Sequence, residues 1–273
     1  MTKSDVYYRI IFVKKIFFLF VAFMSLAIVV PAFAAYPVKP TPPEAPPLPE
    51  ISGEYTVPGR PNLILRVIPH PEKPNHTTKV TKAVCTADND STEVVSGAGW
   101  HLKDCTTTYR VNYASVPSTV GASAADTAFT NAFATWDNLV TDVTIVKGSS
   151  TNVKRARFDS QNAVFFGRLS SSSIGITYIW YYPSTGEVAE VDTAYNSRYR
   201  WSYTPYTVSA CGTDNSFDLQ NIATHEKGHW FGLDDEYDGA YFDNTMYGYG
   251  DLGELKKDTL TAGDTANLTA IYK

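Results

Sequence analysis

The sequence predicts an α/β domain over residues 106–273, and three observations lead to this fold class. Short stretches rich in β-branched and aromatic residues, several of alternating polarity, are typical of strands. Longer stretches between them carry apolar residues at helical spacing. The chain of 273 residues is 44% hydrophobic, which is enough to bury a core without disulfides or metals.

Strands and a first helix are expected in the first part of this region. The expected strands lie at 107–113, 143–146, 163–166, 175–182 and 187–195. The last two form a hairpin around a turn at 183–186. A helix is expected at 122–140, where Phe129, Phe133 and Trp136 fall on one face.

Two more helices are expected towards the C-terminus. The second is predicted at 217–231, with Ser216 as its N-cap and Gly232 ending its regular run. The third begins near Thr261, because Thr261 and Asp264 lie three residues apart in an arrangement close to a capping box. Its single apolar face indicates a packing role.

Residues 1–35 have the features of a cleaved signal peptide. Basic residues precede an apolar run at 16–30, and Ala32 and Ala34 then supply the small-x-small pattern of a cleavage site. An uncleaved anchor is the alternative, but the run of about 15 residues is shorter than the ~20 that a spanning helix needs. The mature chain is therefore expected to be secreted or attached to the cell envelope, without stable membrane insertion.

Residues 36–105 are harder to interpret. A Pro-rich stretch at 36–61 predicts an extended spacer. One short strand is expected at 62–68, and we expect Pro69 to end it. This part of the chain is an N-terminal extension or a pro-segment, and the sequence does not decide between the two.

Charge and cysteine content exclude some functions. The net charge is -5 and no basic block is present, which argues against nucleic acid as a partner. An exported chain with three cysteines is expected to form one disulfide and keep one free thiol. Cys85 and Cys105 are the preferred pair because they are nearest in sequence, with Cys211 free, although sequence does not fix the connectivity.

The stretch His225-Glu226-Lys227-Gly228-His229 has the pattern HExxH. On a helix, positions i and i+4 share a face, so His225 and His229 can bind one zinc ion. Glu226 would lie beside the metal without binding it, where it can act as the catalytic base on water that the metal activates.

The residues after this motif predict a third ligand. Gly232 can adopt φ > 0 and let the chain fold back, which makes Asp235 a suitable oxygen ligand in the pattern HExxHxxGxxD. Met246 then lies in a segment, 243–249, that has the position of a methionine turn beneath the metal. Because Met1 and Met24 belong to the signal peptide, Met246 is the methionine expected in the mature chain.

At these residues the chain resembles the matrixin-type metzincins, in their compact bacterial and archaeal branch. The resemblance covers roughly residues 106–273 and includes the motif at 225–235, the turn at 244–250 and the closing segment at 260–272. Residues 190–196 resemble the acidic strand that borders the substrate cleft in that family.

The resemblance implies a mixed twisted sheet over an active-site helix, followed by a C-terminal helix. It implies a monomeric zinc metalloendopeptidase that acts on protein or peptide substrates, and it leaves structural Ca²⁺ possible without a specified site. Two features depart from the family. Asp235 stands where histidine is more usual, and Cys85 lacks the neighbours of the cysteine that keeps family pro-forms latent.

Two alternatives remain open. In a gluzincin-type peptidase Glu254, with Asp258 four residues later, would supply the third ligand, but this needs a helix at 252–258. In a non-catalytic module the zinc would be structural, and such sites are usually closed by four protein ligands. No fourth ligand is evident from the sequence.

Overall fold

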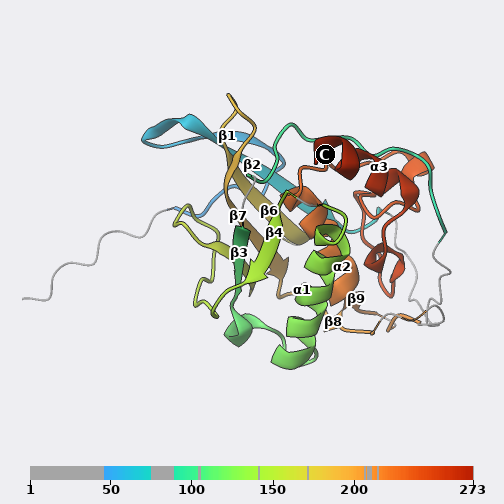
Figure 1. The fold of residues 1–273 in the computed structure, drawn as a ribbon. Coiled ribbons are helices and arrows are strands. Elements are labelled where there is room, and N and C mark those ends of the chain that lie inside the picture. Colours follow the sequence, from blue (N-terminus) through green and yellow to red (C-terminus); the bar gives the residue numbers. More distant parts are fainter. Residues whose placement is uncertain are drawn as a thin grey trace, which may run out of the picture. The chain divides into compact units, whose positions relative to one another are not determined.

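A seven-stranded mixed sheet is the framework of the fold in this computed structural model (Figure 1). The structure describes residues 46–74, 89–103, 106–140, 142–170, 172–205, 207, 211–213 and 215–272. The expected signal peptide at 1–35 and the first part of the Pro-rich spacer lie outside these residues. The predicted combination of α-helices with a β-sheet is confirmed.

The sheet has the strand order β1-β2-β6-β7-β5-β3-β4. Its strands are β1 (Gly53–Val57), β2 (Arg60–Pro71), β3 (Thr106–Val111), β4 (Thr144–Lys147), β5 (Asn162–Gly167), β6 (Ser173–Tyr181) and β7 (Val188–Asn196). Strands β3, β4, β5 and β7 are parallel, whereas β6 and the β1–β2 hairpin are antiparallel to their neighbours. All five strands predicted from the sequence of this region are present, with ends shifted by one or two residues.

Three α-helices accompany the sheet: α1 (Ala122–Asp137), α2 (Leu219–Trp230) and α3 (Ala262–Ile271). The prediction for α1 is confirmed at its start, and the helix ends three residues earlier than expected. The prediction that the second helix starts at Phe217 with Ser216 as cap is wrong. Phe217 and Asp218 form strand β9 (Phe217–Asp218) beside β8 (Trp201–Ser202), and Asp218 is the N-cap.

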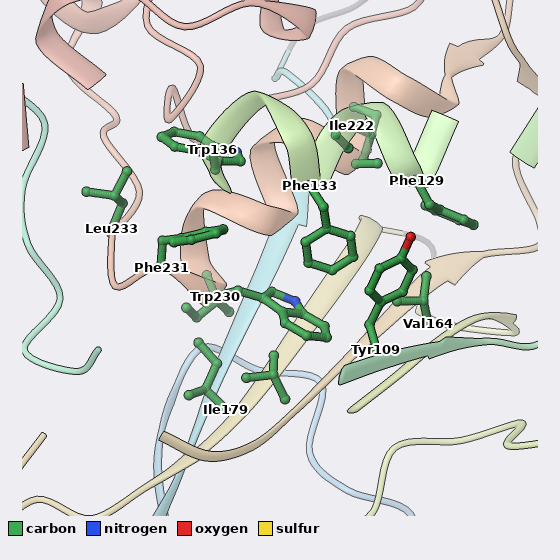
Figure 2. Close-up of a cluster of buried hydrophobic side chains, with 14 of the residues drawn as sticks. Tyr109, Phe129, Phe133, Trp136, Val164, Ile179, Ile222, Trp230, Phe231 and Leu233 are labelled. Atoms are coloured by element: carbon green, nitrogen blue, oxygen red, sulfur yellow. The ribbon is translucent and has the colours of Figure 1, made fainter. Parts of the chain in front are cut away.

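Helices α1 and α2 pack together on one face of the sheet and bury a large aromatic cluster (Figure 2). Phe133 of α1 meets Trp230 of α2 edge-on, with ring centroids 5.0 Å apart. A second cluster, which includes Leu65 and Val67 of β2, covers the opposite face. Both faces of the central strands are therefore buried, which is why β6 is continuously apolar or small rather than alternating.

Strand β2 is longer than predicted, because it continues through Pro69 and ends at Pro71. Proline has no backbone N–H, so it cannot donate one of the hydrogen bonds by which a central strand pairs with its neighbours. The β1 partner, however, pairs only as far as Val67, so β1 needs no N–H from the prolines of β2. The N-terminal extension thus joins the same sheet as the strands of residues 106–273.

Two smaller observations concern the cysteines and the membrane. Cys211 is disulfide-bonded, so the expectation that Cys85 pairs with Cys105 and leaves Cys211 free is wrong. Cys85 and Cys105 lie outside the described residues. Within the part of the chain that the structure describes, none of the helices has the length and apolar character needed to cross a bilayer.

Candidate metal centre

Helix α2 carries three of the four predicted site residues in the interior. His225, Glu226 and His229 have no exposed surface. The two imidazoles lie one turn apart on the same face of the helix, with ring centroids 4.9 Å apart. The start of the helix is fixed because the Asp218 carboxylate accepts hydrogen bonds from two backbone N–H groups of the first turn.

Backbone carbonyls orient both imidazoles and determine their tautomers. His225 Nδ1 lies 2.8 Å from the carbonyl oxygen of Thr245, and His229 Nδ1 lies 2.9 Å from that of Leu233. Because a carbonyl can only accept, each Nδ1 must carry the proton. In the neutral state each ring would then present a bare Nε2 on its other side, which is the form that binds a metal.

The surroundings favour the neutral form of His225. Burial lowers its pKa to about 3, and the nearby charge of Lys257 acts in the same direction. Lys257 is itself buried, and its ammonium group donates to the carbonyl oxygens of Tyr247 and, at 3.0 Å, Tyr249. A fixed cation in this place disfavours a second positive charge on the imidazole.

Asp235 meets both imidazoles through one carboxylate oxygen. Its Oδ1 lies 3.1 Å from His225 Nε2 and 3.5 Å from His229 Nε2. The predicted turn at Gly232 is confirmed, since its φ of 94° directs the chain back after the helix. The geometry thus brings together the three ligands that the sequence predicted.

The carboxyl of Asp235 favours the ionised form. Burial alone would raise its pKa, whereas the hydroxyl of Tyr237 lowers it by donating a hydrogen bond to the carboxylate. Tyr237 donates to the second oxygen, Oδ2, at 2.9 Å. This hydrogen bond leaves Oδ1 directed at the imidazoles.

Met246 lies against α2 behind the ligands, as expected for the predicted methionine turn. It is fully buried, and a Cβ added to Gly228 would lie only 2.2 Å from its Sδ. Asp264 holds the turn, because its carboxylate accepts from the backbone N–H of Thr245 at 2.9 Å and of Met246 at 3.3 Å. The same carboxylate completes the predicted capping box with Thr261, so α3 positions the site as well as packing against it.

Glu226 extends from α2 towards β6. Its Oε2 accepts a hydrogen bond of 2.5 Å from the hydroxyl of Thr177, and a Cβ added to Gly175 would lie 2.6 Å from its Oε1. That Oε1 is buried and has no hydrogen-bond partner among the described residues. Burial raises the pKa of Glu226, which suits a group that accepts and later releases a proton.

His70 is a fourth candidate ligand, which the sequence analysis missed. It lies near the end of β2, is fully buried, and its ring centroid is 3.9 Å from that of His225. His70, His225 and Asp235 each offer one ligand atom, and these three atoms lie within 4.8 Å of one another. Strand alternation could have indicated its direction, because Ile64, Ile68 and His70 share one face of β2 and the two isoleucines contact the cluster around α1 and α2.

Lys227, within the HExxH motif, is a second residue whose environment the sequence did not reveal. Its side chain is fully buried, and Nζ lies 4.6 Å from the ring centroid of Trp230 and 5.0 Å from that of Phe133. Burial lowers its pKa. These aromatic contacts are cation–π interactions that partly replace the lost water.

The donor set fits a divalent cation. By their tautomers, Nε2 of His225 and of His229 are acceptors, and so is the Asp235 carboxylate. Yet Asp235 Oδ1 lies 3.1 Å from one Nε2 and 3.5 Å from the other, and none of the three atoms has a hydrogen-bond partner in the described parts of the chain. Acceptors that converge this closely repel one another unless a cation lies between them. Two imidazoles and a carboxylate are ligands typical of zinc.

Glu254, the third ligand of the gluzincin alternative, has other partners. Its Oε2 accepts from the side-chain amide of Asn221 at 3.3 Å, and its Oε1 lies 3.4 Å from Lys256 Nζ. The stretch at 252–258 contains a short 3-10 turn, Lys256–Asp258, instead of the α-helix that this alternative needs.

The site is closed to solvent in this structure. All of its imidazoles and the Glu226 carboxylate are completely buried, and the Asp235 side chain is 5% exposed. Two surface cavities lie elsewhere, one beside β3 and one beside β5, and neither is lined by a site residue. A substrate would reach the site only after some segment moves.

No family model matches the chain, and no curated protein matches it either. Its function must therefore be argued from the arrangement of its own side chains.

Proposed function

We propose that the chain is a secreted zinc-dependent endopeptidase of metzincin type. His225, His229 and Asp235 hold the metal, and Glu226 is the catalytic base. The mixed sheet, the buried helix α2 and the C-terminal helix α3 support the resemblance to matrixin-type metzincins. Protein or peptide substrates, a monomeric state and export by the signal peptide belong to the same proposal, and structural Ca²⁺ stays a prediction without assigned residues.

One observation carries this proposal: three buried acceptor atoms face one another beside a carboxylate of raised pKa. Asp235 Oδ1 lies 3.1 Å from His225 Nε2 and 3.5 Å from His229 Nε2, which calls for a cation. Glu226 lies on the same helix with Oε1 free of hydrogen bonds to the described residues. A structural metal site would not need that carboxylate.

The proposed reaction is hydrolysis of a peptide bond. The metal, when bound, polarises the scissile carbonyl and lowers the pKa of a coordinated water. Glu226 accepts a proton from the attacking water as the new C–O bond forms. It then passes that proton to the amide nitrogen as the C–N bond breaks, so the products are an amine and a carboxylic acid, which then releases its own proton to the solvent. Thr177 orients the carboxylate through its hydrogen bond to Oε2.

His70 favours a second candidate, a closed structural zinc site. With His225, His229 and Asp235 it would complete four protein ligands, the number usual in structural sites. The two candidates differ in whether Glu226 affects any chemistry. A structural site loses nothing measurable when this carboxylate becomes an amide.

Zinc content and peptide hydrolysis measured on the same preparations test the proposal. The full chain and its Glu226→Gln variant are each prepared with and without the further change His70→Ala, and casein and a quenched-fluorescent peptide library are the substrates. We expect about one zinc per chain throughout, and hydrolysis that a chelator abolishes. Glu226→Gln should lower hydrolysis by about 10²–10⁴-fold without loss of zinc.

Glu187→Gln is the matched control, because Glu187 lies at the turn between β6 and β7 and should leave hydrolysis unchanged. Stoichiometric zinc with no hydrolysis in any of these proteins would establish the structural site instead. Absence of bound zinc would overturn both candidates.

A further inference from the structure

We infer that β2 is a built-in inhibitory strand that occupies the peptide groove and gives the metal a fourth protein ligand, His70. This inference rests on the proposed function. It assigns a role to the N-terminal extension, which the sequence alone left undecided.

Strand β2 pairs with β6, the strand that carries Thr177, the hydrogen-bond donor to the proposed catalytic base Glu226 (Figure 1). It runs antiparallel to β6, with His70 opposite Gly175 and Ile68 opposite Thr177. Thr177 donates to Glu226, so β2 passes the point where a substrate carbonyl would have to lie. Without the β1–β2 hairpin, β6 would be the edge of the sheet, and extended peptides bind to such edges by adding a strand.

The end of β2 is also held from the other side. The backbone N–H of Gly250 donates to the Pro71 carbonyl at 3.1 Å, and that of Lys73 donates to the Gly250 carbonyl at 3.0 Å. Gly250 follows the methionine turn. Residues 70–73 are therefore bound between β6 and the segment after Met246, as an extended peptide in a groove with two walls would be.

The side chain of His70 points into the metal centre. It is fully buried, and within the described ranges neither of its ring nitrogens has a hydrogen-bond partner. A buried imidazole without partners is costly, and a metal ion removes that cost. A Cβ added to Gly250 would lie 2.9 Å from His70 Nε2, so glycine at that position leaves space for the ring.

A fourth protein ligand has a direct consequence for activity. A catalytic zinc site needs one position for water or substrate, and His70 fills it. Activity then requires that His70 be exchanged for water and that β2 leave the groove. A cut in the chain on the C-terminal side of β2 would leave the hairpin held by non-covalent contacts alone, from which a substrate can displace it.

The test measures access to the metal separately from hydrolysis. The full chain is loaded with Co²⁺ in place of zinc, and acetohydroxamate, a bidentate metal ligand, is titrated while the visible spectrum is recorded. The variants are His70→Ala and the bulkier His70→Gln, which keeps the volume of the site if alanine impairs folding. His101→Ala is the matched control, because this histidine lies beside Gly186, at the far end of the hairpin between β6 and β7.

We expect acetohydroxamate to bind the His70 variants at least about tenfold more tightly than the unchanged chain, and His101→Ala to behave like the unchanged chain. Peptide hydrolysis should rise by a similar factor in the His70 variants and disappear when Glu226→Gln is added. Equal acetohydroxamate affinity with and without His70 would overturn the inference, and so would loss of Co²⁺ from both His70 variants. Opened metal without hydrolysis would support the role of His70 and refute the endopeptidase.

Discussion

Two groups of buried acidic and basic side chains differ in how their polar atoms are satisfied. In the candidate metal centre, His70, His225, His229 and Asp235 each have a buried polar atom without a hydrogen-bond partner among the described residues. On β7, the carboxylates of Glu190 and Asp192 are equally buried but accept backbone hydrogen bonds from the segment at 157–163. The first group keeps buried polar atoms without partners in the described chain, as the proposed metal site would, whereas the second group is satisfied by the backbone.

The second group also bears on an expectation from the family resemblance. Residues 190–196 resemble an acidic strand beside the substrate cleft, but the structure places them in β7, an interior strand between β5 and β6. Their acidic side chains fix a loop to the sheet: Asp192 accepts from Ala163 at 2.7 Å, and Glu190 accepts from Asp159 at 2.8 Å. In the arrangement inferred above, β6 and not β7 would border the peptide groove.

The largest effect should follow from removing a converging atom. Asp235→Ala deletes the oxygen between the two imidazoles, so we expect zinc affinity to fall by more than about a hundredfold, beyond the effect of losing an outer partner. Asp238→Ala is the matched control, because Asp238 lies three residues further on, is exposed, and its carboxylate accepts from the backbone N–H of Ala240 instead. Competition with a chromophoric chelator measures both. Equal zinc affinity in the two variants would show that Asp235 is not a ligand.

A smaller effect should come from Lys227. Its Nζ is buried without a hydrogen-bond partner in the described structure. It lies among aromatic rings, where it cannot bind a metal. Lys227→Met keeps the length of the side chain and removes the cost of burying an ammonium group. We expect the free energy of unfolding to rise by about 1–4 kcal/mol, as when buried charges are replaced by apolar groups. Among the causes that shift the pKa of Glu226, Lys227 is a minor one, so the site should persist.

Chemical denaturation of the zinc-free protein measures this difference, with the exposed Lys154→Met as control. If Lys227→Met loses stability and the control does not, the cation–π contacts outweigh the cost of burying the ammonium group. The aromatic rings would then be sufficient partners for it.

The sequence predicted the ligands that local geometry determines. His225 and His229 lie one helical turn apart, and Asp235 follows the turn at Gly232. Both relations depend only on residues that are near in sequence. His70 could not be found in this way, because its place depends on which strand β2 pairs with. The helix start was missed for a similar reason. Ser216 and Asp218 are both good caps, and the pairing of Phe217 and Asp218 with β8 decides between them.

The smallest expected effect concerns the satisfied group and depends on pH. Burial raises the pKa of Glu190 to about 7, although backbone hydrogen bonds oppose this. The folded state therefore favours the protonated carboxyl. The protonated Glu190 carboxyl contributes fully to the free energy of unfolding below the unfolded pKa of ~4.5, and this contribution is lost as pH rises towards 7.

Glu190→Gln cannot ionise, so its stability relative to the unchanged chain should improve by about 1 kcal/mol between pH 4.5 and pH 7, after allowance for solvent screening. The absolute stability of the variant can be lower at every pH, because an amide replaces a carboxylate that accepts several N–H groups. The slope is therefore the informative quantity. Thermal unfolding of both proteins in the presence of a chelator measures it without a contribution from the metal centre. If the stability of the variant relative to the unchanged chain instead falls as pH rises, the backbone N–H groups hold Glu190 ionised. Their hydrogen bonds then outweigh the effect of burial on its pKa.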